Sequence, residues 1–316
     1  MIPDLIHFVW LGHNLPLFGR FAVASARRHN PGTKIWFWHS HAFDYDTNFM
    51  HVIRNEDVIP KRLEISELFT DRCWVDCGLD LKTLEVMLLE AGDFVARSNI
   101  ARALILYRYG GIYLDVDTLV VQSFDSLRQH WAFMGREHIV WPGFQVNSDS
   151  LYEQIVGPVC SAVRLFCARI PHGYLIFQIL NRFYYKEANS AVWGALPKHP
   201  IIHYVLGYTC NVRESEWSTP HRLGTHVLQR AVRDYVQYHS DLNLLSPEAF
   251  YPLGPVISRH YFHRYTNLVR ICDHVLSPST YVLHWYASAN NLNSIDEQEL
   301  RSLKDTIFGY LCVDYL

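Results

Sequence analysis

The sequence lacks any long apolar run. None of its segments reaches the roughly 18 consecutive apolar residues that a membrane-spanning helix needs. Its opening, MIPDLIHFVWLGHNLP, also lacks the basic leader and long apolar stretch of a secretory signal. We therefore expect no integral membrane segment and a cytoplasmic location. The same absence agrees equally with delivery into a host cell by a system that needs no signal peptide.

The sequence also lacks regularly spaced cysteines and has little net charge. Its 7 cysteines are scattered and odd in number, which argues against a disulfide framework and fits a reducing compartment. Cys73 and Cys77 have no matching second pair, so we expect no zinc site. A net charge of -3 over 316 residues gives no electrostatic reason to expect binding to nucleic acid or to an acidic membrane.

The N-terminal residues predict the start of a parallel sheet. LIHFVWL (5–11) is a short run rich in aromatic and branched residues, bounded by Pro3 and Gly12, and indicates a buried strand. FGRFAVASARRHN (18–30) has a helical pattern, and PGTKIWFWHS (31–40) returns to a strand after a turn. This β-α-β order is typical of a parallel sheet covered by helices.

The middle of the chain predicts a long helical stretch followed by a strand. Apolar residues from Leu81 to Tyr109 recur with a helical period, and Gly110 and Gly111 end the helix. IYLDVDTLVV (112–121) is then expected as one buried strand. Because no repeat or linker divides the chain, we predict a single α/β domain over residues 1–316, with a helical insertion around 122–190.

Two acids lie inside that apolar run. Asp115 and Asp117 would be costly to bury without a positive partner. On an extended strand, side chains two residues apart point the same way. Both carboxylates could therefore bind one hard cation such as Mg²⁺ or Mn²⁺, which commonly shares its ligands with substrate phosphates. The second such triplet, Asp44-Tyr-Asp46, lies in a polar stretch and is expected to be a solvated turn.

Other ionisable residues are less specific. Arg102 stands in an apolar helix and needs a buried partner, either a phosphate or Asp115. His260 and His263 in SRHYFHRY are expected to pack in the core or face solvent. A hydrolase of phosphate esters with two metals would need a larger His and Asp cluster than this sequence displays, so that alternative ranks low.

Four segments resemble, in order, the landmarks of one enzyme family. They are IPDLIHFVWLG, RSNIARALILYRYGGIYLDVD, GALPKHPIIHYVL and FYPL. They are similar to the glycosyltransferases that carry a sugar-binding region with a DxD motif, a group that includes the large clostridial toxin glucosyltransferase domains. The resemblance implies a GT-A fold, which is Rossmann-like with a mostly parallel central sheet flanked by helices. Residues 122–188 match none of the landmarks and suggest an added helical region.

The resemblance also implies an activity. It implies a retaining hexosyl- or N-acetylhexosaminyltransferase that uses Mn²⁺ or Mg²⁺ and a nucleotide-sugar donor, most simply a UDP-sugar, with a protein or glycan as acceptor. Two alternatives to a toxin-like bacterial effector acting on a host stay open. One is an enzyme of cell-envelope polysaccharide or glycolipid synthesis, and the other is a weakly active or inactive sugar-nucleotide binding protein.

Positions of this sequence that match the family's motifs receive roles by resemblance. Val9 and Trp10 would hold the uracil base, although core packing is the alternative for Trp10. Arg102 would reach the donor sugar and diphosphate. Asp115 would contact ribose and sugar hydroxyls, and Asp117 would bind the metal directly.

Further positions complete the expected site. Tyr113 joins the donor-binding group. The closing segment VLHWYASANN supplies His284 as the preferred additional metal ligand, followed by Ser288, which would also contact the donor, and Asn290. The alternative for His284 is a core histidine with satisfied hydrogen bonds.

Two positions depart from the family's pattern. Asn99 stands where the family has Asp, which changes the hydroxyl contacts to the donor sugar or weakens turnover. Ala289 follows Ser288 where the family has Trp, so the indole that covers the diphosphate is either missing or supplied by Trp285.

Overall fold

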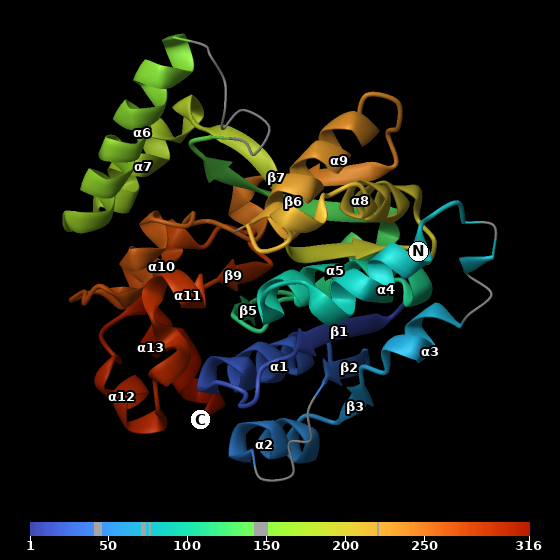
Figure 1. Ribbon diagram of the computed structural model, residues 1–316. Helices are drawn as coiled ribbons and strands as arrows, with labels where there is room; N and C mark the ends of the chain where they lie inside the picture. Colours follow the sequence, from blue (N-terminus) through green and yellow to red (C-terminus); the bar gives the residue numbers. More distant parts are fainter. Residues whose placement is uncertain (41–45, 71–73, 76, 142–150, 220) are drawn as a thin grey trace.

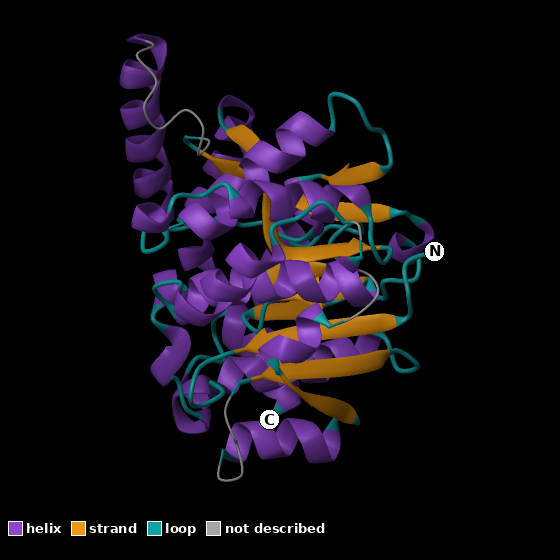
Figure 2. Cartoon of the chain, turned by 45° about the vertical axis from the view of Figure 1, so that its right-hand side comes forward, coloured by secondary structure: helices purple, strands orange, loops and turns teal. Residues whose placement is uncertain are grey.

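A seven-stranded sheet runs through the middle of the protein (Figures 1 and 2). The computed structural model describes the whole chain except residues 41–45, 71–73, 76, 142–150 and 220. The strands of the sheet stand in the order β3-β2-β1-β4-β7-β6-β8. Their bounds are β1 Leu5–Trp10, β2 Lys34–His39, β3 Val58–Arg62, β4 Gly111–Leu114, β6 Ala132–Ile139, β7 Tyr185–Ala195 and β8 Leu242–Leu245.

The sheet is mostly parallel. Strands β1 to β4 run in one direction, while β7 is antiparallel to both of its neighbours, β4 and β6. Because β6 is parallel to β8, these two strands run in the same direction as β4. Among the described strands of this sheet, β7 alone is reversed. The predicted α/β class with a mostly parallel central sheet is therefore confirmed.

Helices cover both faces of this sheet because side chains alternate along each strand. In β4, Ile112 and Leu114 belong to the apolar core under α1 and the C-terminal segments, whereas Tyr113 belongs to the core under α4, α5, α8 and α9. The longer helices are α1 Leu17–His29, α2 Thr47–Asn55, α4 Leu81–Glu90, α5 Phe94–Tyr109, α8 Pro200–Cys210 and α9 Val227–Tyr235. The predicted helical stretch before the glycines is thus two helices, α4 and α5.

The expected single strand over residues 112–121 is wrong. β4 ends at Leu114, and a separate strand, β5 (Thr118–Val120), begins after a turn. The Thr118 hydroxyl donates to the Asp115 carbonyl at 2.7 Å, and such local side-chain bonds compete with extended pairing. β5 then leaves the central sheet and pairs antiparallel with β9 (Val282–His284). The two aspartates therefore flank a turn at the end of β4.

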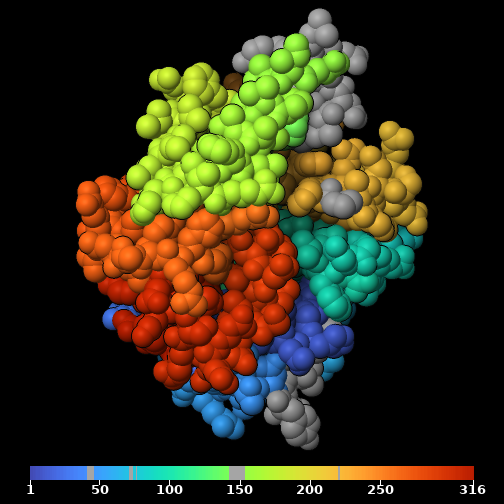
Figure 3. All heavy atoms as spheres, turned by 90° about the vertical axis from the view of Figure 1, so that its left-hand side faces the viewer, coloured from blue at the N-terminus to red at the C-terminus, as the bar shows by residue number. Residues whose placement is uncertain are grey.

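The stretch around 122–190 contains both helices and strands. Its helices are α6 (Leu151–Arg169) and α7 (Gly173–Leu180), but β6 and the first residues of β7 belong to the central sheet. Figure 3 shows α6 and α7 in yellow-green above the orange and red C-terminal segments. In the part of the chain that the structure describes, no helix has the length and apolarity needed to cross a membrane.

The C-terminal segments pack beneath α6 and α7. They comprise α10 (Leu268–Val275), β9, α11 (Ala287–Asn290), α12 (Glu297–Ser302) and α13 (Ile307–Cys312). His260, which precedes them, is fully buried, with Nε2 2.8 Å from the Cys167 carbonyl and Nδ1 2.8 Å from the Tyr265 hydroxyl. His260 therefore packs in the core, as expected, and His263 next to it is half-buried.

Candidate functional site

The carboxyl ends of the parallel strands gather the predicted residues at one edge of the sheet. β1 ends at Trp10 and the neighbouring β4 ends at Leu114, so Trp10 and Asp115 lie at the same edge. In open α/β sheets this edge is where ligands bind. The β5–β9 pair brings the C-terminal segment to the same place, because Thr118 lies opposite His284.

Asp117 and His284 are in direct contact there. His284 Nε2 lies 3.0 Å from Asp117 Oδ1, and the backbone N–H of Ala287 donates to Asp117 Oδ2 at 2.9 Å. Burial alone would lower the pKa of His284, but the Asp117 carboxylate raises it above its usual value. Burial would conversely raise the pKa of Asp117, yet His284 and the Ala287 N–H lower it. The charged pair is therefore favoured.

Asp115 is held by a different set of groups. Its carboxylate oxygens lie 3.0 and 3.3 Å from the two terminal nitrogens of Arg102, and the Tyr113 hydroxyl donates to Oδ1 at 2.6 Å. Arg102 also stacks over the Tyr113 ring at 4.6 Å and donates to the Ser190 carbonyl at 2.9 Å. Burial raises the pKa of Asp115, and Arg102 opposes this rise. Of the two partners offered for Arg102, the structure shows Asp115.

Asp115, Asp117 and His284 together can hold a divalent cation. One potential ligand atom from each of the three residues lies within 4.8 Å of the other two. The Nδ1 atom of His284 is buried and has no hydrogen-bond partner among the described residues, so the ring's second nitrogen is not committed to the protein. Two carboxylates and an imidazole are a donor set that Mn²⁺ accepts. The residues present therefore fit the predicted metal.

Val9 and Trp10 lie at the end of β1. Val9 is buried between the sheet and the helices, whereas Trp10 is half-buried. The Trp10 indole N–H donates to the Asn14 carbonyl at 3.0 Å. The backbone of Gly12 lies against the ring so closely that a β-carbon there would stand 2.9 Å from an indole carbon. Glycine at position 12 therefore allows the loop after β1 to fold over the indole.

The closing segment divides into residues near the cluster and residues that support the turn. Ser288 is exposed on α11, directly after Ala287. The Asn290 side-chain amide donates to the Ser258 hydroxyl at 3.0 Å and to the Trp285 carbonyl at 2.8 Å, so it fastens the turn that carries α11. Whether Ser288 and Asn290 bind metal stays a prediction.

Trp285 does not supply the missing indole. Its side chain is fully buried and packs edge-on against Tyr261 and Phe308. His284, the last residue of β9, faces Asp117, whereas Trp285, which follows the strand, enters the core. The suggestion that Trp285 covers a diphosphate is therefore wrong.

Asn99 lies one turn before Arg102 on α5 and is half-buried. The backbone of Gly224 faces its side-chain amide, and a β-carbon at Gly224 would lie 2.4 Å from Asn99 Nδ2. The segment Arg222–His226 therefore covers Asn99 closely.

Sequence reasoning missed one acid beside the cluster. Glu137 of β6 is 4% exposed, and the Tyr286 hydroxyl donates to its Oε2 atom at 2.9 Å. The Tyr286 ring lies against the His284 ring, with centroids 4.1 Å apart. Unlike Asp115, Glu137 stands between two other polar residues, Arg136 and His138, so the local sequence gave no sign that it would be buried.

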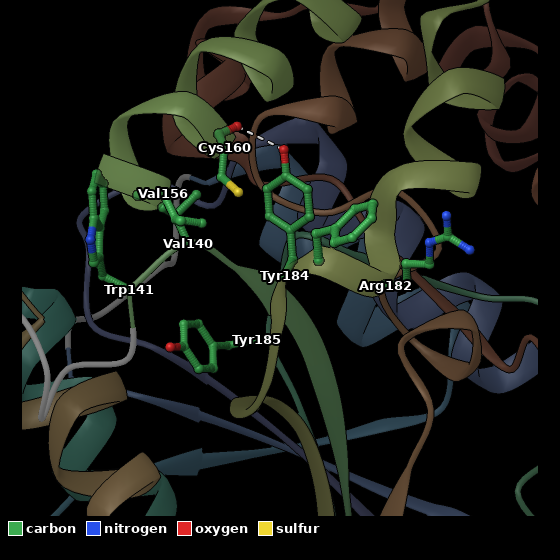
Figure 4. A pocket seen from close by; sticks show the side chains of 9 residues that line it. Val140, Trp141, Val156, Cys160, Arg182, Tyr184 and Tyr185 are labelled. Carbon is green, nitrogen blue, oxygen red and sulfur yellow. Dashed lines mark hydrogen bonds between the residues drawn. The ribbon is translucent and has the colours of Figure 1, made fainter. Parts of the chain in front are cut away.

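A pocket of about 330 Å³ opens beyond the carboxyl end of β6, near Glu137 (Figure 4). Val140 and Trp141 follow the strand and form one wall, and α6 forms another. The Tyr184 hydroxyl donates to the Cys160 carbonyl at 2.7 Å. Figure 4 shows this hydrogen bond as a dashed line, with the Tyr185 ring lower in the view than Trp141. The lining residues are Val140, Trp141, Val156, Gly157, Cys160, Arg182, Phe183, Tyr184 and Tyr185.

The other candidates from the sequence lie elsewhere. Asp46 of the second triplet caps α2 by accepting the Phe49 N–H at 2.8 Å and also accepts the Leu15 N–H at 2.6 Å. Its partner Asp44, like Cys73, lies outside the described residues.

The sequence matches the model of a protein family described as "Glycosyltransferase sugar-binding region containing DXD motif" over residues 20–134. This match includes Asn99, Arg102, Asp115 and Asp117. It confirms the resemblance drawn from the sequence and the prediction of a glycosyltransferase. A search of curated proteins finds no match.

The solved structures that the chain is similar to include glycosyltransferases that are remote in sequence. "PaToxG Glycosyltransferase" is 13% identical, with a TM-score of 0.48, over 98% of this chain and 87% of that chain. The UDP-bound glycosyltransferase domain of the YGT toxin is 11% identical, with a TM-score of 0.44, over 77% and 79%. The galactosyltransferase LgtC, in complex with donor and acceptor sugar analogs, is 13% identical, with a TM-score of 0.36, over 95% and 99%.

Proposed function

We propose that this glycosyltransferase moves a hexosyl or N-acetylhexosaminyl group from a UDP-sugar to a protein or glycan acceptor, with retention at the anomeric carbon. The observation that carries the proposal is the meeting of Asp115, Asp117 and His284 at the carboxyl edge of the sheet. Mn²⁺, or Mg²⁺ in its place, is the proposed cofactor. Retention is taken from the family resemblance and needs its own measurement.

The residues of the site would have two tasks, which are to hold the cation and to bind the hydroxyl groups of the donor. Asp117 and His284, together with Asp115, would hold the cation, and the Ala287 N–H keeps Asp117 in place. A bound cation would neutralise charge that develops on the diphosphate leaving group. Asp115, fixed by Arg102 and Tyr113, would accept hydrogen bonds from the donor's ribose and sugar hydroxyls.

The uracil and the acceptor would lie on either side of this centre. Trp10, half-buried at the end of β1, would stack on the base, with Val9 beneath it. The pocket beyond β6 would receive part of the acceptor, since aromatic side chains line it and its volume suits a ligand.

One observation favours a second function, a sugar-nucleotide binding protein of weak activity. Asn99 stands where the family has an acid, and Gly224 crowds its amide. An acid there would accept hydrogen bonds from sugar hydroxyls without donating any. If the wild-type protein binds UDP-sugar without turnover and Asn99→Asp restores cleavage, this second function is correct.

The deciding experiment is incubation with a panel of UDP-sugars and Mn²⁺, followed by measurement of UDP and free sugar. We expect release of UDP from one donor, loss of release on chelation, and loss in Asp117→Ala. Proton NMR of the transferred sugar would report retention. If no UDP-sugar is bound or cleaved by the wild-type protein, the proposed function fails.

The acceptor's class needs a second measurement. Labelled sugar would be offered with host-cell lysate in one arm and with bacterial glycolipid extract in the other. Label in protein supports an effector that acts inside a host cell, and label in glycolipid supports a cytoplasmic enzyme of envelope synthesis.

A further inference from the structure

Glu137 is a buried acid without an assigned task. It lies near the carboxyl end of β6, opposite Glu187 of β7. Glu137 is 4% exposed, and its hydrogen-bond partners include the Tyr286 hydroxyl, 2.9 Å from Oε2, and the Asn189 side chain. Acids are rarely buried to this degree unless they are paired, so a specific use is expected.

Its partner Tyr286 lies in the chain between the two groups that contact the Asp117 carboxylate. Tyr286 joins β9 to α11 with a φ of 51°, in the left-handed region that bulky residues seldom occupy. Before Tyr286 in the chain, the His284 imidazole contacts Asp117, and directly after Tyr286 the Ala287 N–H donates to Asp117. The conformation of Tyr286 therefore decides whether both groups reach the same carboxylate.

The hydrogen bond to Glu137 fixes the hydroxyl end of the Tyr286 side chain. The Tyr286 hydroxyl is hydrogen-bonded to β6, while its ring contacts the His284 ring at an interplanar angle of 59°, with centroids 4.1 Å apart. Strained backbone persists where the surrounding structure holds it, and such residues gather at functional sites. A rigid strand of the central sheet thereby supports a short turn that has little secondary structure of its own.

Charged groups on neighbouring elements complete the surroundings. Arg164 of α6 and His284 of β9 both act on the Glu137 carboxyl, and both lower its pKa against the rise that burial causes. The Nε atom of Arg164 is buried and has no hydrogen-bond partner among the described residues. Glu137 thus faces the Tyr286 hydroxyl in a setting that also contains two cationic groups.

We propose that Glu137 is a positioning residue for the metal centre. Through the Tyr286 hydroxyl it holds the segment from His284 to Ala287 in the conformation that binds the cation, and with it the diphosphate. This inference rests on the proposed function, since it presupposes the cation at Asp115, Asp117 and His284. Groups that orient metal ligands in this way typically change metal affinity by about 10- to 100-fold when they are removed.

The test compares Mn²⁺ binding among variants of the full chain. Tyr286→Phe and Glu137→Ala both break the hydrogen bond and should weaken Mn²⁺ binding by about 10-fold or more, measured from free Mn²⁺ by electron paramagnetic resonance. Glu137→Gln keeps an acceptor oxygen and should bind Mn²⁺ within about threefold of wild type, since Gln can still accept from the Tyr286 hydroxyl. The Tyr286→Phe/Glu137→Ala double variant should bind no more weakly than either single variant.

Glu187→Gln is the matched control. Glu187 lies directly across the sheet on β7, is half-buried, and has Arg233 as its own partner at 3.9 Å. It should bind Mn²⁺ as wild type does. Amide hydrogen exchange of the metal-free variants gives a second readout, because Tyr286→Phe should speed exchange at the Ala289 and Asn290 amides, which donate to the Tyr286 carbonyl.

The possible outcomes distinguish a failure of the proposed function from a failure of the positioning role of Glu137. If wild type binds neither Mn²⁺ nor UDP, the proposed function fails. If wild type binds both but Tyr286→Phe and Glu137→Ala bind Mn²⁺ equally well, the positioning role is overturned. It is also overturned if Glu187→Gln weakens binding as much as Glu137→Ala does, because the effect would then be general to the sheet.

Discussion

The pair of Arg102 and Asp115 makes the sharpest prediction about stability. Arg102→Met keeps most of the side chain's apolar length and removes its charge. It would leave Asp115 with the Tyr113 hydroxyl as its remaining side-chain hydrogen bond in the structure, and would remove the donor to the Ser190 carbonyl. The side chains of Arg102 and Asp115 are only 6% and 23% exposed, so solvent replaces little of the loss.

The magnitude follows from that geometry. Breaking a buried ion pair costs about 3–5 kcal/mol in unfolding free energy. Because Asp115 is partly exposed and keeps its bond from Tyr113, we expect about 3 kcal/mol, the lower end of that range. Asp115→Asn in the Arg102→Met background should cost almost nothing more, because it removes the unpaired charge. The two substitutions should therefore be non-additive by at least about 1.5 kcal/mol.

The measurement is the free energy of unfolding in urea, at pH 7 and with a chelator present so that bound metal makes no contribution. It is made on wild type, on each of the two single variants, and on the double variant. Single variants that change the midpoint but not the slope keep the comparison valid. If the free energies add within about 0.5 kcal/mol, the two side chains act independently and the reasoning is refuted.

Three further predictions concern the site and the sheet. Asp117→Ala and His284→Ala should each lower Mn²⁺-dependent UDP release by about 100-fold or more; release that is unchanged in either variant would count against the metal centre. Trp141→Ala should reduce transfer to acceptor but not UDP-sugar hydrolysis, whereas Trp131→Ala, an exposed Trp before the other end of β6, should change neither. Burial lowers the pKa of His7 to about 4 from 6.5, so the unfolded chain takes up its proton first on acidification. His7 should thus cost about 3 kcal/mol of stability as the pH falls from about 6.5 to about 4, and urea midpoints of wild type and His7→Gln across this range should diverge.

The sequence was sufficient to predict the start of the sheet, and it singled out the two aspartates of the Asp115, Asp117 and His284 cluster. The β-α-β opening follows from short apolar runs separated by turn residues, and both signals are local. Arg102 was expected to need a buried partner, either a phosphate or Asp115, and the structure pairs it with Asp115. His284 was reached through a resemblance, and no local pattern places it opposite Thr118.

What the sequence could not predict depends on contacts between distant strands. IYLDVDTLVV is continuously apolar apart from its acids, so nothing local marks the point where β4 ends. The break depends on β5 finding β9, more than 160 residues later. Trp285 and Glu137 were misjudged or missed for the same reason, since which face of a strand is buried depends on what packs against it.

The turn between the two aspartates changes how their roles can be divided. On one continuous strand, both carboxylates would have met the ligand from the same side with equal freedom. In the turn, both oxygens of Asp115 are engaged by Arg102, whereas Asp117 is engaged by His284 and by the Ala287 N–H, which belong to the C-terminal segment. Asp115 is therefore fixed to the helix and sheet that carry the matched sugar-binding region, and Asp117 depends on a segment outside it. Changes at Asp117, His284 or Tyr286 should accordingly affect metal affinity together, while changes at Asp115 should follow Arg102.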